Sequence, residues 1–274
     1  MEEIINILYK LDDLCSIYKN DSDINKINKN GHLNYIQVDN IVIDIILKSK
    51  IYHNITKGYM DITCKPLLDL VKTNKKDDIN KYLYLVNSNN ILIKEPNLIK
   101  LKYEGMSIDL GSIVKGYATD IIVDILNKYN IHDALIDLGG NIYVKGKNKN
   151  NLKWKVGIQD PFNIHNKPIG YLELSNKSVV TSGAYERGKH IINPHTGDLV
   201  DSDIKSVSII ADKSIDAEGL STAYFIIGKQ GIKDINKMAN IDCIYIDENK
   251  NIYLSKGLKN KVIILNNDYK IKEI

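Results

Sequence analysis

The sequence predicts an α+β fold in which helices pack against mixed and antiparallel sheets. Apolar residues recur at helical spacing through much of residues 1–73, whereas residues 134–183 contain short apolar runs broken by Gly, Pro and Asn. Strands and helices are mixed without a regular β–α–β alternation, which favours α+β over a doubly wound parallel sheet. No repeat and no Pro- or Ser-rich linker divides the chain, so we expect a single domain over residues 1–274.

The first part of the chain predicts mainly helices. Residues 1–15 carry apolar side chains at helical spacing, which is typical of an amphipathic helix. Ser22 can cap a short helix in the polar stretch that follows. A longer helix is expected at about 37–50, and another within 60–73, entered through Pro66 in its first turn.

The rest of the chain predicts strands with a few helices among them. A strand pair is expected on either side of the Glu95-Pro96-Asn97 turn. Further strands are expected at 134–146, 153–161, 170–175, 178–183 and 205–212. Helices are then expected at 217–227 and 229–239, followed by a strand pair over 241–255.

The composition excludes several classes of protein. Apolar residues make up 43% of the chain, charged residues 26%, and the net charge is +3 without a block of Lys or Arg, which argues against nucleic acid binding. The three cysteines, Cys15, Cys64 and Cys243, form no CxxC pair, so neither a disulfide framework nor a cysteine zinc site is expected. No run approaches the roughly 18 apolar residues of a membrane span. The acidic N-terminus lacks a signal peptide or lipobox, so we expect a cytoplasmic protein.

One stretch, "SIDLGSIVKGYATDIIVDIL" over residues 107–126, suggests a phosphate-binding turn. A predicted strand ends at Asp109, and the chain then passes small residues with Lys115 and Gly116 and enters a predicted helix. The stretch matches neither the G-x-x-x-x-G-K-[ST] nor the G-x-G-x-x-G pattern. By itself it fits a plain tight connection equally well.

Two further positions suggest chemistry. Glu218 and Thr222 are four residues apart, so on a helix they share one face and offer oxygen ligands to a hard divalent cation such as Mg²⁺. A solvated Glu beside a Thr is the simpler alternative. His190 follows a basic turn and could act as a general base, because the pKa of histidine is near neutrality. It could equally pair with backbone at a strand start. The spacing of the six histidines does not predict a histidine metal site.

Taken in order, the motifs resemble a known family over almost the whole chain. They are "MDIT" with "PL", "DLGSIVKGYATD", "LIDLGGNIYVKG", "GIQDP", "TSGAYER", "HIINPHTG" and "SVSIIA" followed by "AEGLSTA". This order and spacing resemble the ApbE family, the FAD:protein FMN transferases. The glycine-turn motif and the "HIINPHTG" and "AEGLSTA" pair are the most specific parts. The resemblance implies an ApbE-like fold.

The resemblance also implies an activity and a set of site residues. Family members use Mg²⁺ and FAD, transfer FMN onto a Thr or Ser of an acceptor protein and release AMP; some instead hydrolyse FAD to FMN and AMP. The resemblance places FAD against Tyr18, Tyr59, Met60, Asp61, Asp109, Lys115 and Ile192. It places the metal at Ser112, through its backbone carbonyl, with Glu218 and Thr222. His190 matches the essential histidine of the family.

The chain departs from the family pattern at several places. Members usually begin with a further strand carrying an "MGT"-like segment, whereas this sequence opens at the first helix, so part of the flavin pocket is expected to be missing. Glu218 replaces an Asp and is one methylene longer. Asn193 replaces the acid of "HIIDP", and Gly188-Lys189 shortens a hairpin. Two alternatives stay open: an FAD pyrophosphatase, which would share every site residue, and a flavin-binding protein without catalysis, which the missing strand and Asn193 suggest.

Overall fold

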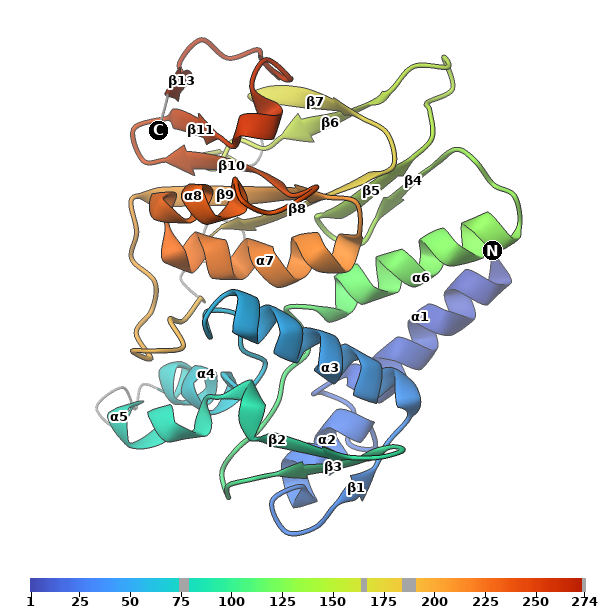
Figure 1. The fold of residues 1–274 in the computed structure, drawn as a ribbon, viewed down its shortest axis with the longest axis vertical. Coiled ribbons are helices and arrows are strands. Elements are labelled where there is room, and N and C mark those ends of the chain that lie inside the picture. Colours follow the sequence, from blue (N-terminus) through green and yellow to red (C-terminus); the bar gives the residue numbers. More distant parts are fainter. Residues whose placement is uncertain (74–78, 164–166, 184–190, 273–274) are drawn as a thin grey trace. The chain divides into compact units, whose positions relative to one another are not determined.

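The computed structural model describes residues 1–73, 79–163, 167–183 and 191–272, which form two compact units (Figure 1). The first unit comprises Met1–Val114 and Ile192–Val200, and the second comprises Lys115–Ile191 and Asp201–Ile274. This division does not test the single-domain prediction, which stays a prediction. Within the described ranges, no helix has both the length and the apolar character needed to cross a membrane.

The first unit contains most of the helices that the sequence predicts. They are α1 (Glu2–Cys15), α2 (Asp23–Asn30), α3 (Asn40–Ile55) and α4 (Lys65–Lys72). The short α5 (Ile79–Tyr82) was not predicted. Ser22 caps α2 as predicted, because its hydroxyl accepts a hydrogen bond from the Asn25 N–H at 3.1 Å. Helix α3 begins later than predicted because the Asp39 carboxylate caps it, accepting from the Ile41 N–H at 2.9 Å. It also ends later than predicted, at Ile55.

A small antiparallel sheet completes the first unit. Its strands are β1 (Ile36–Gln37), β2 (Ile91–Lys94) and β3 (Leu98–Leu101), in the order β1-β3-β2. Ile93 pairs with Ile99 across the turn at Pro96, which confirms the predicted strand pair. Two 3₁₀ turns, Leu83–Leu85 and Ser88–Asn90, lead into β2. The second of these turns carries Ser88 into the polar cluster described below.

The prediction of a strand ending at Asp109 is wrong. The backbone there belongs to no strand. The Asn28 side chain on α2 takes the place of a neighbouring strand: its amide donates to the Ile108 carbonyl at 2.9 Å and its carbonyl accepts from the Ile108 N–H at 2.7 Å. The Asp109 N–H then donates to the Ile62 carbonyl at 2.8 Å. The backbone groups are therefore satisfied without a strand ladder.

The second unit is built on a seven-stranded sheet, called the large sheet here, in the order β13-β11-β10-β9-β8-β5-β4. Its strands are β4 (Ala134–Asp137), β5 (Asn141–Lys145), β8 (Lys177–Gly183), β9 (Ile204–Ala211), β10 (Asp242–Asp247), β11 (Asn251–Leu254) and β13 (Lys270–Lys272). Neighbouring strands are antiparallel, apart from the parallel pair β11–β13. This arrangement confirms the mixed and antiparallel character predicted from the sequence.

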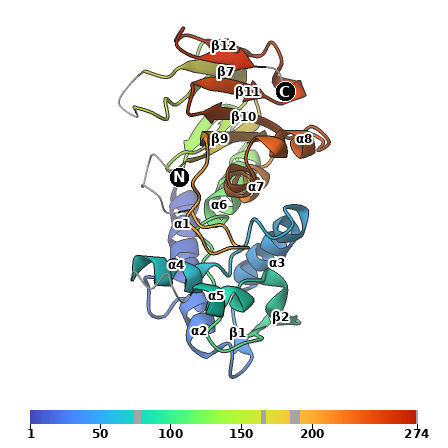
Figure 2. The same ribbon diagram turned by 90° about the vertical axis from the view of Figure 1, so that its left-hand side faces the viewer.

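Two layers cover the large sheet. A small antiparallel sheet of β6 (Trp154–Ile158), β7 (Gly170–Leu174) and β12 (Val262–Ile264) shares an apolar core with it, in which Leu172 and Ile244 are each 1% exposed. On the other side lies α7 (Ser214–Ile227), which contacts β8 and β9 (Figures 1 and 2). Strand β9 is buried along nearly all its length because it is covered from both sides.

The remaining helices of the second unit are α6 (Val114–Lys128), α8 (Ile232–Ile235) and the 3₁₀ turns Lys229–Gly231 and Lys256–Leu258. The helix predicted over 229–239 is thus much shorter than expected, a 3₁₀ turn followed by one helical turn. Gly228 stops α7 with a φ of 77°, and the chain turns sharply there. The close packing of Gly231 against the Tyr224 ring, 2.5 Å from where a Cβ would lie, fixes the following turn.

Candidate functional site

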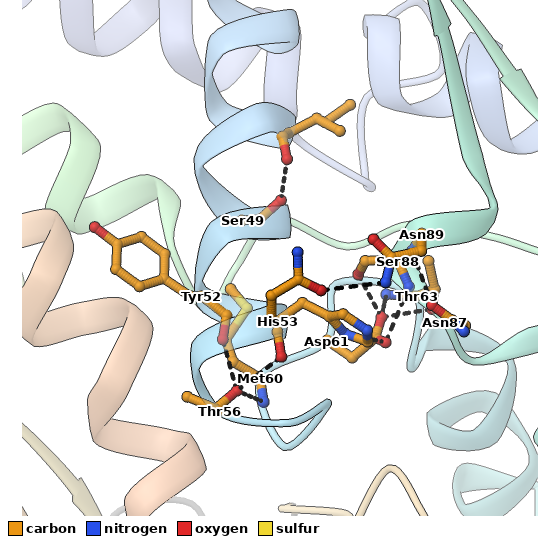
Figure 3. A network of polar contacts seen from close by, with 12 residues as sticks. Ser49, Tyr52, His53, Thr56, Met60, Asp61, Thr63, Asn87, Ser88 and Asn89 are labelled. Atoms are coloured by element: carbon orange, nitrogen blue, oxygen red, sulfur yellow. Dashed lines mark hydrogen bonds and ion pairs between the residues drawn. The ribbon is translucent and has the colours of Figure 1, made fainter. Parts of the chain in front are cut away.

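The predicted site residues fall into two groups, one in each unit. In the first unit they surround Asp61, whose side chain is 1% exposed. The Asp61 carboxylate accepts hydrogen bonds from the Thr63 N–H at 2.8 Å and hydroxyl at 2.5 Å, and from the Ser88 hydroxyl at 2.7 Å and N–H at 3.1 Å. Figure 3 shows these groups converging on the carboxylate. Hydrogen bonds from Thr63 and Ser88 therefore hold the Asp61 carboxylate in place.

His53, near the end of α3, also contacts this carboxylate. Its Nδ1 lies 2.9 Å from Oδ2 of Asp61, at the distance of a charged hydrogen bond, although the ring N–H is not well aligned with the oxygen. Burial raises the pKa of Asp61, but the contact with His53 and the hydrogen bonds from Thr63 and Ser88 outweigh burial, so the pKa is lowered. The carboxylate is ionised at neutral pH.

Tyr59 and Met60 lie just before Asp61 in a tight turn. Gly58 adopts a φ of 87°, and a Cβ there would lie 3.0 Å from Cε1 of His195. The Tyr59 ring packs edge-on against the His195 ring, with centroids 4.6 Å apart. The Met60 side chain is buried, and its N–H donates to the Thr56 hydroxyl at 2.9 Å. Thr56 and His195 therefore hold this segment from both sides. The sequence did not indicate the contact with His195.

Asp109 lies beside this segment, because its N–H donates to the carbonyl of Ile62. One oxygen of its half-buried carboxylate accepts from the Gly111 N–H at 2.8 Å and opens the turn that contains Ser112. The structure thus brings Asp109 next to the predicted Tyr59–Asp61 segment.

Ile192 and Tyr18 have different surroundings. Ile192, 5% exposed, packs in an apolar cluster with Leu67 and Ile79 and pairs with Leu199 in a short bridge. Tyr18 follows α1 and is 87% exposed. Its backbone N–H donates a hydrogen bond to the Ser16 hydroxyl at 3.2 Å. Neither position shows what it binds, so both stay predictions, as does Ser112.

In the second unit the predicted residues meet around Glu218 on α7, which is 5% exposed. Its Oε1 lies 3.3 Å from the ammonium of Lys115 on α6. Its Oε2 accepts from the side-chain amide of Asn141, at the start of β5, at 2.5 Å. Both carboxylate oxygens therefore have partners, and Asn141 is a site residue that sequence reasoning missed. Its place in "DLGGN", after two glycines and before a strand, was the available signal.

Thr222 lies one turn further along α7 on the same face as Glu218. Its hydroxyl contacts that of Ser182 at the end of β8, at 3.1 Å, and the Ser182 hydroxyl donates to Ser221 at 2.9 Å. The hydroxyl groups of Ser182, Ser221 and Thr222 thus lie together beside this face of α7.

Helices α6 and α7 are joined closely at this point. A Cβ at Gly116 would lie 2.7 Å from the Ser214 carbonyl and 2.8 Å from the Glu218 Cβ, so only glycine fits. Asp120 on α6 caps α7, because its carboxylate accepts from the N–H groups of Ser214 at 2.7 Å and Ile215 at 3.1 Å. Gly116 therefore serves helix packing, and the predicted turn at Lys115 is the first turn of α6.

The donor set around Glu218 fits a hard cation. Among the described residues, no three His, Cys, Asp or Glu side chains lie close enough together to bind a metal by themselves. One carboxylate and the Thr222 hydroxyl offer oxygen ligands only, which suits Mg²⁺, a metal that keeps waters and binds substrate phosphates. The ammonium of Lys115 beside Oε1 shows that this position accommodates a positive charge. His190 lies outside the described residues.

A family model supplies the identification. Residues 1–245 match the model described as the ApbE family. The chain belongs to the ApbE family. A curated relative from Treponema pallidum, named FAD:protein FMN transferase, is 36% identical over 192 residues, covering 64% of this chain and 53% of the relative. A relative of the same name from Klebsiella pneumoniae is 28% identical over 285 residues, covering 98% of this chain and 88% of the relative.

Solved structures of ApbE proteins have the same fold. The ApbE protein from Thermotoga maritima matches with a TM-score of 0.84 and 26% identity, covering 95% of this chain and 90% of that chain. The flavin transferase ApbE from Vibrio cholerae matches with a TM-score of 0.84 and 22% identity, covering 95% of this chain and 89% of that chain. These likenesses confirm the predicted ApbE-like α+β fold.

Proposed function

We propose that this protein is an Mg²⁺-dependent FAD:protein FMN transferase that acts on a Thr or Ser of an acceptor protein and releases AMP. The observation that carries the proposal is the Glu218 cluster in a chain of this family. A buried carboxylate, a lysine and a neighbouring hydroxyl provide what a pyrophosphate and its counter-cation require. Curated relatives matched over most of this chain are named for the same activity.

The reaction exchanges a phosphoanhydride bond of FAD for a phosphoester bond to the acceptor. The acceptor hydroxyl oxygen bonds to the phosphorus on the FMN side of the pyrophosphate, and the bond from that phosphorus to the bridging oxygen breaks. The bridging oxygen leaves with AMP, and the hydroxyl proton passes to a base, for which we propose His190. Such a transfer depends on positioning and on stabilising negative charge rather than on covalent chemistry of the protein.

The residues of this chain have separate tasks in the proposal. Lys115 contacts a pyrophosphate oxygen as a point charge. Glu218 and Thr222 would hold Mg²⁺, with the Ser112 carbonyl as the further ligand that the family resemblance implies, and the ion would supply positive charge to offset that of the pyrophosphate. In the first unit, Tyr59, Met60, Asp61 and Asp109 bind FAD, with Tyr18 and Ile192. Because the Asp61 carboxylate already accepts bonds from Thr63 and Ser88, we assign its segment's FAD contacts to backbone groups and to Tyr59.

The test measures AMP and protein-bound flavin together. FAD and Mg²⁺ are added to the protein with and without a flavin-acceptor domain that carries a target Thr, and flavin is read by in-gel fluorescence. Equal amounts of AMP and acceptor-bound flavin are expected, both lost in EDTA. AMP without labelled acceptor would instead indicate an FAD pyrophosphatase. Neither product, with FAD still raising the melting temperature, would indicate a flavin-binding protein without catalysis.

A further inference from the structure

Asn141 carries a buried amide whose two polar atoms have different tasks. Its side chain is 0% exposed at the start of β5. The carbonyl Oδ1 accepts from the hydroxyl of Thr119 on α6 at 3.0 Å and from the hydroxyl of Ser214 on α7 at 2.7 Å. The amide Nδ2 donates to Oε2 of Glu218 at 2.5 Å. The amide therefore joins both helices to the carboxylate.

The Glu218 carboxylate, which can only accept hydrogen bonds, fixes the orientation of this amide. If the amide turned over, its NH₂ group would face Thr119 and Ser214, and its carbonyl oxygen would face the Glu218 carboxylate. That arrangement would set one acceptor against another inside a buried cluster, which costs the full price of an unsatisfied group. The NH₂ group therefore faces Glu218, and the hydroxyls on α6 and α7 donate to the carbonyl on the other side of the amide.

The two carboxylate oxygens of Glu218 consequently have different partners. A glutamate has several rotatable bonds, and fixing them costs side-chain entropy that a ligand would otherwise have to offset. The bond from Asn141 orders Oε2 in advance. The other oxygen, Oε1, faces the ammonium of Lys115 at 3.3 Å, on the side where a cation is already tolerated.

We propose that Asn141 is a positioning residue that holds Oε2 of Glu218 and so leaves Oε1 to bind the divalent cation. The inference rests on the proposed metal role of Glu218. It concerns a residue that touches neither cation nor FAD and acts through the carboxylate alone. Partners of this kind typically change metal affinity by about 10–100-fold when they are removed.

The test measures cation affinity on protein free of FAD. Mn²⁺ is titrated in as the probe, and the EPR signal of the free ion gives its dissociation constant. Asn141→Ala should raise this constant about 10-fold or more. Thr181→Val is the matched control: it removes a half-buried hydroxyl that contacts Ser208 at 2.7 Å on the same sheet, so it should leave the constant unchanged.

A double substitution separates positioning from a general loss of structure. If Asn141 acts through the carboxylate, Asn141→Ala should have no further effect on the Mn²⁺ constant in a Glu218→Ala background, whereas independent effects would add. Thr119→Val, which removes one donor to the amide, should raise the constant in the same direction by less. It also serves as the test if Asn141→Ala does not fold.

The outcomes are distinct. An unchanged Mn²⁺ constant in folded Asn141→Ala and Thr119→Val, with a raised constant in Glu218→Ala, would overturn the positioning role alone. An unchanged constant in Glu218→Ala would remove the metal role of Glu218 and the inference with it. Flavin transfer by the wild-type protein is measured separately, so its failure would concern the proposed function and leave the Mn²⁺ result standing.

Discussion

Gly116 and Glu218 lie so close together that a Cβ on the glycine would lie 2.8 Å from the Cβ of the glutamate. The contact joins the first turn of α6 to the helix that carries the proposed cation ligand. It also places Lys115, the neighbour of Gly116, within 3.3 Å of Oε1. The glycine is therefore the residue that allows lysine and carboxylate to meet.

Gly116→Ala should lower the free energy of unfolding by about 1–3 kcal/mol, as expected for an over-packed core. Alanine would gain roughly 1 kcal/mol of helix propensity, but its methyl group would press on the backbone of Ser214 and Ile215, which cannot move like a flexible side chain. Urea unfolding measures the change. Asp124→Ala on the exposed side of α6 is the control, with an expected change within about 0.5 kcal/mol. A more stable Gly116→Ala would contradict the close packing.

The lowered pKa of Asp61 predicts a loss of stability in acid. Since the folded-state pKa lies below the unfolded value of about 3.9, the ionised carboxylate contributes stability above that value. This contribution is lost as the pH falls through the folded-state pKa. Asp61→Asn should cost about 1–3 kcal/mol at neutral pH, and the difference from wild type should shrink below about pH 4.

Urea unfolding at several pH values gives this difference directly. The control is Asp69→Asn, because Asp69 is 51% exposed beside Lys65 and an exposed pair contributes little. A difference between wild type and Asp61→Asn that stays constant down to about pH 2 would show that Asp61 is not stabilised as an anion.

The three cysteines should be unreactive in the folded protein. Burial raises the pKa of Cys15 to about 12, with smaller effects of nearby carboxylates. Burial likewise raises the pKa of the Cys64 and Cys243 thiols, with Asp61 and Asp242 adding to it. Because the thiolate is the nucleophile, a thiol reagent at about pH 8 should label the native protein slowly. Three thiols per chain should react in denaturant; rapid labelling of native Cys15 or Cys243 would contradict their burial.

His190→Ala should lower flavin transfer by about 10²–10⁴-fold while leaving FAD binding nearly intact, because a general base acts on the acceptor hydroxyl. The pH–rate profile should lose its acidic limb. Asn193→Asp is a suitable second variant. The side-chain oxygen of Asn193 accepts a hydrogen bond from the backbone N–H of His195 at 3.0 Å, and a carboxylate can accept the same bond. The added anion should move the acidic limb of the profile to higher pH. Normal turnover by folded His190→Ala would remove it from the mechanism.

Local patterns in the sequence determined several secondary-structure elements and caps of this protein. Helix α1, the cap at Ser22 and the strand pair around Pro96 follow from periodicity and turn chemistry over a few residues. The shared face of Glu218 and Thr222 follows from helix geometry alone. The order and spacing of the motifs were enough to indicate the family, because both can be read from the sequence without knowing how the chain folds.

Only the tertiary structure decided which groups meet. Asn141 and Glu218 are 77 residues apart, and Asp120 caps a helix that begins 94 residues later. Asn28, 80 residues before Ile108, satisfies the backbone where a strand was predicted. Periodicity tells which face of an element is buried, but it carries no information about the partner that covers that face. Such pairings depend on how the chain returns on itself, and the polar network around Glu218 is fixed by those long-range contacts.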